Sequence, residues 1–401
     1  MHVGVGYSDN PETGEAGRQA VAEAVKQAGR IEPCDMVLLF ATARHDAETL
    51  RRAVAEAVGE NVPIVGGGAV GAISNHSFGY AGDQIVLALF WLEEASCEFI
   101  TESGLDGSED AVGARLGAAF AARGVTPESQ VLLFYDAIDR TKGGMRMVMA
   151  TYLLKAIEDS LGFLPALNGA GLQGDYLCTP TAQWLGGSLG MHSALALIFS
   201  GSVRVDTAIM HGCRPATGYY TVTKADAQTI LEINGEPALR FLNSLLGESI
   251  TPDEYPFFLI LGVNKGDKWG EFDENSYASR LCLAVDKERD GLVMFEPDMV
   301  EGTEFQIMYR SLNLDYMAPK MEKLFDDLED RTPVFALYID CAGRAAGFGG
   351  RDLEDAVAVQ KAVANRVPLL GIYTGVEIAA VEGRPRGLDW TGVFCLFSVP
   401  K

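Results

Sequence analysis

The densest group of residues that could do chemistry is the segment IDCAGRAAGFGG, residues 339–350. It brings together a thiol (Cys341), a guanidinium (Arg344) and glycines such as Gly343 whose backbone amides are free to face a ligand. An apolar stretch precedes it, which predicts a loop at the end of a strand, where α/β proteins bind ligands. Arg344 can hold a carboxylate through two parallel hydrogen bonds. The alternative is that Arg344 pairs with a surface acid and that Cys341 is a small core residue.

A ligand that carries both a carboxylate and an amine also needs a negative partner. Glu377 follows the Tyr373–Thr374 turn and can supply this charge, with Tyr373 as an aromatic wall. The ordinary alternative is a solvated glutamate at a strand end. Arg280 lies inside a predicted strand, where a charge is costly unless it is paired, so it is either structural or part of the cleft.

Other chemistries have weaker support in the sequence. Cys341, with a distant histidine and Asp136 or Asp340, could form a thiol nucleophile acting on a carbonyl substrate. His192 or His211 could ligate a non-covalent haem in a gas sensor, since one imidazole suffices. The five histidines form no HExxH motif, and no serine lies in a GxSxG turn. We therefore expect no metal site and no resident cofactor, and a binding protein rather than an enzyme.

Two turns match the pattern G-x-G-x-x-G. They consist of Gly66, Gly68 and Gly71, and of Gly169, Gly171 and Gly174. A dinucleotide site requires a helix directly after such a turn, but residues 72–83 after the first turn are not helical in pattern. We therefore reject NAD binding and interpret these glycines as sites of close backbone packing.

The elements that must position these residues recur three times along the chain. Residues 34–91, 128–202 and 332–400 each give an apolar strand, a polar loop, an amphipathic helix, a proline-led strand with a glycine turn, and another apolar strand. Short Val-, Ile-, Leu- and Phe-rich strands buried by helices predict an α/β fold with mixed sheets. We predict three βαββ-type repeats.

Two regions lie outside the repeats. In the first, residues 2–29, the pattern predicts a strand and then a helix that begins near Pro11, with Asn10 as its N-cap. The second, residues 228–317, predicts an α+β insert before the third repeat. Residues 214–227 are rich in turn formers and predict a connector. The expected division is thus 1–213, connector 214–227, and 228–401.

Composition restricts the possible partners. The 401 residues include 32 Lys and Arg against 55 Asp and Glu, a net charge of −23. Nucleic acids and anionic membrane surfaces both require clustered basic residues, so neither is an expected partner. The apolar runs are too short for membrane insertion and no signal peptide is recognisable, which predicts a cytoplasmic protein. Seven scattered cysteines without a CxxC pair indicate no disulfide framework.

Taken together, the motifs resemble the FIST family, in which a FIST N-terminal domain precedes a FIST C-terminal domain. The resemblance covers most of the chain and is carried by GVGYSD (4–9), DMVLLFAT (35–42), VPIVGGGAVGAI (62–73), INGEPALRFLNSLLG (233–247), SRLCLAVD (279–286), MVEGTEFQIM (299–308), IDCAGRAAGFG (339–349) and PLLGIYTGVEI (368–378). It implies a sensory, signal-transduction protein that binds a small metabolite, an amino acid in particular. It also implies that Arg344, Cys341, Gly343, Tyr373, Thr374, Glu377 and Arg280 surround the ligand. No kinase, cyclase or DNA-binding segment is recognisable, so we expect a separate signalling output protein as partner.

Overall fold

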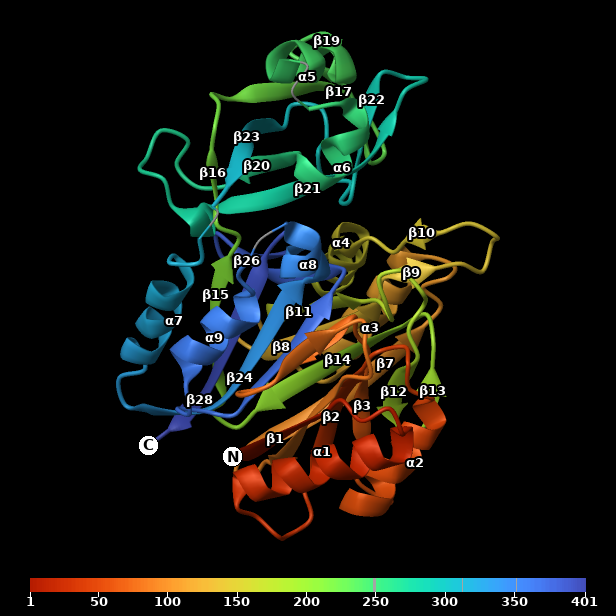
Figure 1. The fold of residues 1–401 in the computed structure, drawn as a ribbon, viewed down its shortest axis with the longest axis vertical. Coiled ribbons are helices and arrows are strands. Elements are labelled where there is room, and N and C mark those ends of the chain that lie inside the picture. Colours follow the sequence, from red (N-terminus) through yellow and green to blue (C-terminus); the bar gives the residue numbers. More distant parts are fainter. Residues whose placement is uncertain (248–249, 312, 351) are drawn as a thin grey trace.

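The structure is a computed structural model of the chain and describes residues 1–247, 250–311, 313–350 and 352–401. It has two parts (Figure 1). The larger part, here called the body, carries both chain termini at one end. The smaller part, here called the insert domain, consists of residues 213–310 and lies at the opposite end.

The body contains three six-stranded sheets with the same pattern of pairings. The first sheet runs β1 (His2–Ser8), β6 (Ile85–Trp91), β2 (Met36–Ala41), β3 (Ile64–Gly68), β12 (Gln183–Gly186), β13 (Leu189–Gly190). The second runs β7 (Ser96–Ser103), β14 (Ser193–Ser200), β8 (Gln130–Asp136), β11 (Ala166–Leu172), β26 (Val376–Val381), β27 (Arg384–Leu388). The third runs β15 (Arg204–Met210), β28 (Gly392–Pro400), β24 (Arg331–Cys341), β25 (Leu369–Thr374), β4 (Gly71–Ile73), β5 (Phe78–Tyr80).

In each sheet the two central strands are parallel and the other neighbours are antiparallel. The predicted α/β class with mixed sheets is therefore confirmed. The last two strands of every sheet come from a different segment of the chain. Strands β12 and β13 complete the first sheet, β26 and β27 the second, and β4 and β5 the third. The division into three repeats stays a prediction, and the topology gives the three predicted segments equivalent places.

Helices cover the outer face of each sheet. The pairs are α1 (Thr13–Ala28) with α2 (Ala47–Val58), α3 (Glu109–Ala122) with α4 (Ala150–Leu161), and α7 (Met317–Asp326) with α9 (Asp355–Val363). The expected N-cap of the first helix was wrong by two residues. Glu12 caps α1 by accepting from Gly14 N and Glu15 N, while Asn10 accepts from Glu12 N and shapes the preceding turn. None of the helices in the described ranges is both long enough and apolar enough to span a bilayer.

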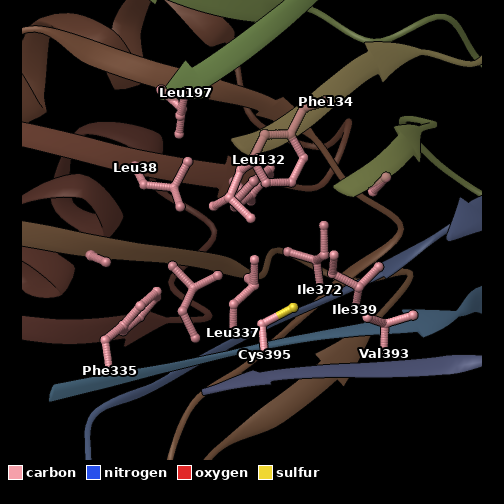
Figure 2. Close-up of a cluster of buried hydrophobic side chains, with 14 of the residues drawn as sticks. Leu38, Leu132, Phe134, Leu197, Phe335, Leu337, Ile339, Ile372, Val393 and Cys395 are labelled. Atoms are coloured by element: carbon pink, nitrogen blue, oxygen red, sulfur yellow. The ribbon is translucent and has the colours of Figure 1, made fainter. Parts of the chain in front are cut away.

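The inner faces of the three sheets meet in one core. Figure 2 shows Leu38 from β2, Leu132 from β8 and Leu337 from β24 directed toward one another. All three side chains are buried, and burying a leucine contributes about 1.5–3 kcal/mol. The ends of the central strands are therefore held in fixed relative positions.

The two glycine-rich turns serve this close packing. A Cβ on Gly66 would lie 2.0 Å from the carbonyl oxygen of Leu39, and one on Gly169 would lie 1.8 Å from that of Leu133. Gly66 also has a φ of +137°, a conformation that residues with a Cβ rarely adopt. The structural interpretation of both motifs is confirmed.

The insert domain is a strongly bent sheet of short strands. Its order is β16 (Cys213–Pro215), β23 (Glu304–Arg310), β17 (Tyr220–Asp226), β18 (Thr229–Ile233), β22 (Gly291–Met294), β21 (Tyr277–Asp286), β20 (Ile260–Asn264), with β19 (Glu236–Pro237) on β18. Strand β23 also pairs with β20, which closes the sheet on itself. Helices α5 (Ala238–Leu246) and α6 (Tyr255–Phe258) complete it. Residues 214–227, expected as a connector, contribute to β16 and β17.

Candidate functional site

A cavity of about 270 Å³ lies between the body and the insert domain. Its floor is formed where the parallel strands β24 and β25 end, as expected for an α/β fold. The body contributes Met145, Met147, Gln173, Tyr176, Cys178, Cys341, Ala342, Gly343, Phe348, Thr374, Gly375, Asp389 and Trp390, and the insert domain contributes Pro256, Leu281, Leu283 and Phe295. Three of the predicted site residues, Cys341, Gly343 and Thr374, line this cavity.

Arg344, predicted as the carboxylate clamp, lies beneath the floor. Its side chain is only 1% exposed. The guanidinium is bound to Asp355, to Asp340 at 3.3 Å and to the hydroxyl of Tyr316 at 2.8 Å. It also donates to the backbone carbonyls of residues 211 and 390 at 3.0 and 3.2 Å. Since an arginine has five N–H donors, these partners use its full capacity. Arg344 thus ties the floor of the cavity together.

Arg280 also has a positioning role. It lies on β21 of the insert domain, fully buried, and forms a two-pronged ion pair with Asp298 at 2.5 and 2.6 Å. It donates further to the carbonyl of Gly387 in β27, at 3.0 Å. This residue therefore joins the insert domain to the body directly beside the cavity.

Tyr373 and Thr374 end strand β25. The Tyr373 hydroxyl donates to Glu354 at 3.3 Å, and its ring meets the ring of Tyr80 edge to face at 5.3 Å. It is fully buried behind the wall. The Thr374 hydroxyl donates to the carbonyl of Gly171 at 2.5 Å, which ties the wall to β11. Tyr373 thus supports the cavity from outside, while Thr374 faces it.

Two buried carboxyl groups, Glu377 and Asp389, form no ion pair with any of the described residues, and Asp389 lines the cavity. Glu377 accepts from Thr391 N at 3.3 Å through Oε2, and its Oε1 has no hydrogen-bond partner in the described structure. Asp389 accepts from Leu281 N at 2.9 Å through Oδ2, and its Oδ1 likewise has none there. Such orphaned buried oxygens are rare in folded proteins and call for a specific explanation.

Burial changes the protonation of both carboxyl groups. It raises the pKa of Asp389 to about 7, with Arg280 opposing this shift and Glu296 adding to it. Burial, followed by the charges of Asp389 and Asp340, raises the pKa of Glu377 well above its usual range. Asp389 therefore exchanges its proton near neutral pH, and burial favours the protonated form of Glu377.

Cys341 is a wall residue with an unreactive thiol. It is 7% exposed, and burial together with the nearby Glu377 raises the pKa of its thiol well above the usual value. A nucleophilic cysteine requires the opposite, a lowered pKa in electropositive surroundings. The structure thus provides no activation for the thiol-enzyme alternative.

The two histidines considered for haem have other places in the fold. His211 is buried; its Nδ1 accepts from Cys213 N at 2.9 Å and its Nε2 lies 3.1 Å from the carbonyl oxygen of Glu274. Burial lowers its pKa to about 4, so the ring is neutral. His192 lies elsewhere in the body and is largely buried. Its Nδ1 is 3.4 Å from Oδ2 of Asp136. Both nitrogens of His211 are thus engaged within the protein.

Trp390 is the most informative residue that sequence reasoning missed. It lines the cavity and has a φ of +53°, an outlier for a bulky residue. Its ring is held by the guanidinium of Arg310, 4.1 Å from the ring centroid. Strained backbone of this kind concentrates at ligand sites. The sequence LDWTG around it carries no recognisable signal.

An aromatic pair borders the cavity on the body side. The rings of Tyr176 and Phe348 stack at 3.8 Å, and Phe348 is 59% exposed. Tyr176 donates from its hydroxyl to the carbonyl of Ala342 at 3.1 Å. Phe348, on the short helix α8 (Ala346–Gly349), therefore lines the cavity while much of its side chain is exposed to solvent.

Fold and site define an α/β protein with a ligand-sized cavity between a three-sheet body and a smaller insert. Two family models match it, the FIST N domain over residues 35–236 and the FIST C domain over residues 238–380. The chain belongs to the FIST family. FIST domains generally serve in sensing and signal transduction, and this is the class of function that the match supports.

Individual relatives add little about activity. An uncharacterized protein of Mycobacterium bovis is 26% identical over 193 residues, covering 47% of this chain and 49% of that protein. One of Mycobacterium tuberculosis is 25% identical over 195 residues, covering 48% and 50%. The chain thus matches about half the length of these relatives. Among solved structures, a cyanuric acid hydrolase from A. caulinodans aligns at 14% identity over 50% of this chain and 71% of that one, and its TM-score of 0.26 supports no argument.

Proposed function

We propose that this protein is a sensor that binds a small amine-bearing metabolite, an amino acid or a close analogue, in the cavity between body and insert domain. The observation that carries the proposal is the Asp389–Trp390 turn. It places at one cavity wall the carboxyl group of Asp389, whose buried Oδ1 has no hydrogen-bond partner in the described structure, and the indole of Trp390, whose backbone is strained. Together these two side chains offer an acceptor for an ammonium group and an apolar surface for the rest of the ligand.

The lining favours an apolar or aromatic side chain on the ligand. Leu281, Leu283 and Phe295 face the cavity from the insert domain, and Trp390 faces it from the body. The described lining includes no lysine or arginine. The amine rather than the carboxylate is therefore the recognised group. We propose that Cys341, Gly343 and Thr374 contact the ligand, while Arg344, Arg280, Tyr373 and Glu377 hold the walls in position.

Binding in this cavity can be transmitted because both parts of the molecule line it. Leu281 of the insert domain donates its N–H to Asp389 of the body at 2.9 Å. An ammonium group on Asp389 adds a favourable interaction only when this wall is assembled, so the ligand shifts the population toward the docked arrangement. A separate output protein that distinguishes the docked from the undocked arrangement would then receive the signal.

A thermal-shift series on the full chain tests the proposal. The probes are phenylalanine, phenethylamine, which lacks the carboxylate, and 3-phenylpropionate, which lacks the amine. We expect the first two to raise the melting temperature and the third to have no effect. A ligand at ten times its dissociation constant stabilises the folded state by about 1.4 kcal/mol.

Variants locate the effect. Asp389→Asn keeps an acceptor for Leu281 N but removes the charge, and it should abolish the shift. The matched control is Asp159→Asn, whose carboxylate lies 63% exposed on α4 and should leave the shift unchanged. Stabilisation by 3-phenylpropionate equal to that by the amines, or an undiminished shift in Asp389→Asn, would show that this site is wrong.

A further inference from the structure

A second cavity, of about 350 Å³, lies on the other side of the contact between β21 and β27. It shares no lining residue with the first cavity. Its walls are Thr151, Leu154, Lys155, Glu158, Leu164, Asp298, Arg384, Pro385, Arg386 and Gly387. Gly387 in this wall accepts the hydrogen bond from Arg280, so the two cavities flank one interdomain contact.

Arg386 on the wall of this cavity forms no ion pair with the described residues. Its side chain is half-buried, and its Nε is inaccessible to solvent yet has no hydrogen-bond partner among the described residues. The described structure also gives it no carboxylate within 4.0 Å. Leaving part of a guanidinium desolvated and unpaired is costly, and proteins normally avoid it.

Lys265 of the insert domain adds a second unpaired cation. It is half-buried, and neither an ion pair nor a side-chain hydrogen bond is found for it in the described structure. Burial, followed by the like charge of Arg386, lowers the pKa of its ammonium group. Lys265 is not itself among the residues that line the cavity. The nearby carboxylate of Asp298 is already held by Arg280 at 2.5 Å.

A third cation, Arg384, stands on the same strand face as Arg386 because alternate residues of a strand point the same way. Arg384 is paired with Glu158 at 2.6 Å. Cations therefore outnumber the carboxylates that can neutralise them in this cavity. The excess is notable in a chain of net charge −23, where acids are abundant elsewhere.

We propose that this cavity is a binding site for a phosphate group, held by Arg386 with Arg384 beside it and favoured by the nearby charge of Lys265. Two guanidinium groups on one strand face suit a tetrahedral dianion, whose several oxygens accept from more than one donor. The volume leaves room for a small phosphorylated metabolite. Because Lys265 belongs to the insert domain and Arg386 to the body, an anion bound at Arg386 offsets the like-charge repulsion between the two parts and strengthens their docking.

The test is titration of the full chain with inorganic phosphate against potassium chloride at matched ionic strength, followed by thermal shift and by calorimetry. We expect saturable stabilisation by phosphate and none by chloride. Arg386→Gln and Lys265→Gln should each weaken phosphate binding at least tenfold. The matched control is Arg52→Gln on α2, 64% exposed, which should bind as the parent does.

Melting temperatures measured with and without phosphate separate a loss of phosphate binding from a loss of fold stability in these variants. Without phosphate, Arg386→Gln and Lys265→Gln should melt no lower than the parent, since each removes a like-charge contact; with phosphate, the parent should gain and the variants should not. Equal responses to phosphate and chloride, or unchanged binding in Arg386→Gln, would overturn the proposal. None of these outcomes depends on the amine site, because the two cavities share no residue.

Discussion

The buried carboxyl group of Asp389 makes a quantitative prediction about pH. The perturbation is Asp389→Asn, which keeps the size of the side chain and an oxygen to accept from Leu281 N, 2.9 Å away in the parent. The new amide group takes the place of Oδ1, which has no partner in the described structure. The variant therefore removes the titration and disturbs little else.

The magnitude follows from the shift in pKa. Folding raises the pKa of Asp389 from 3.8 to about 7, so the folded state binds this proton more tightly than the unfolded chain does. The resulting stability is complete below pH 3.8 and is lost as the pH rises through 7. One pKa unit corresponds to about 1.4 kcal/mol, so the parent loses up to about 4 kcal/mol that Asp389→Asn keeps. Loss of this charge should also lower the pKa of Glu377, which Asp389 raises.

Calorimetric melting of parent and variant between pH 4.5 and 8.5 measures the effect. The advantage of Asp389→Asn should be small at pH 4.5, increase through pH 7 and then level off. Asp159→Asn, altered on the surface of α4, should follow the parent at every pH. Parallel curves for parent and Asp389→Asn, or a variant less stable than the parent at pH 8, would refute this account of the buried carboxyl group.

Three further predictions concern the framework. Arg344→Met removes the cation that pairs with buried Asp355, so the free energy of unfolding measured with denaturant should fall by about 3–5 kcal/mol. A decrease of less than about 1 kcal/mol would contradict the role of Arg344 in holding the cavity floor together. Gly169→Ala forces a Cβ to 1.8 Å from a backbone oxygen and should cost at least about 2 kcal/mol, whereas Gly144→Ala, with open space around it, should cost little. Because His211 stays neutral in the fold, with a pKa of about 4, its own contribution to stability should fall from pH 6.5 down to 4, opposite in sign to that of Asp389. His211→Gln should therefore gain stability relative to the parent as the pH falls through this range in a urea-midpoint profile, and a constant difference between the two would refute this account.

The architecture was largely readable from local pattern. The amphipathic pattern within residues 34–91 predicted the helix α2, which buries Leu50 and Val54, and the apolar runs predicted the central strands of each sheet. The exchange of β4, β12 and β26 between sheets was not predictable, because periodicity reports which face of a strand is buried but not which strand lies beside it. The cap at Glu12 was missed for a related reason, since Asn10 and Glu12 can both accept from nearby amides and only the turn geometry decides between them.

The sequence predicted some of the residues that line the cavity, but not the roles of the buried charges or the contribution of the insert domain. The loop after β24, predicted as a ligand-binding loop, contributes Cys341 and Gly343 to a cavity wall, and ligand binding by this loop stays a prediction. The role of Arg344 could not be read from sequence, because its partner Asp355 lies eleven residues away and was not suspected. Leu281 and Phe295 reach the cavity only because the insert domain docks on the body, and no local pattern encodes that docking.

The distribution of buried charge separates structural residues from binding residues. Arg344 and Arg280 are fully occupied, by Asp355 and by Asp298, so each forms a closed unit that a ligand could enter only by breaking an internal ion pair. The polar atoms that remain without a hydrogen-bond partner in the described structure differ between the two cavities. On one side Asp389 has an orphaned oxygen, and on the other Arg386 has an orphaned nitrogen. These two groups would neutralise each other if they met, yet no described ion pair joins them, and they face different cavities. Stability alone does not account for keeping a carboxyl group and a guanidinium group apart in this way, whereas the two ligands of opposite charge that we propose would account for it.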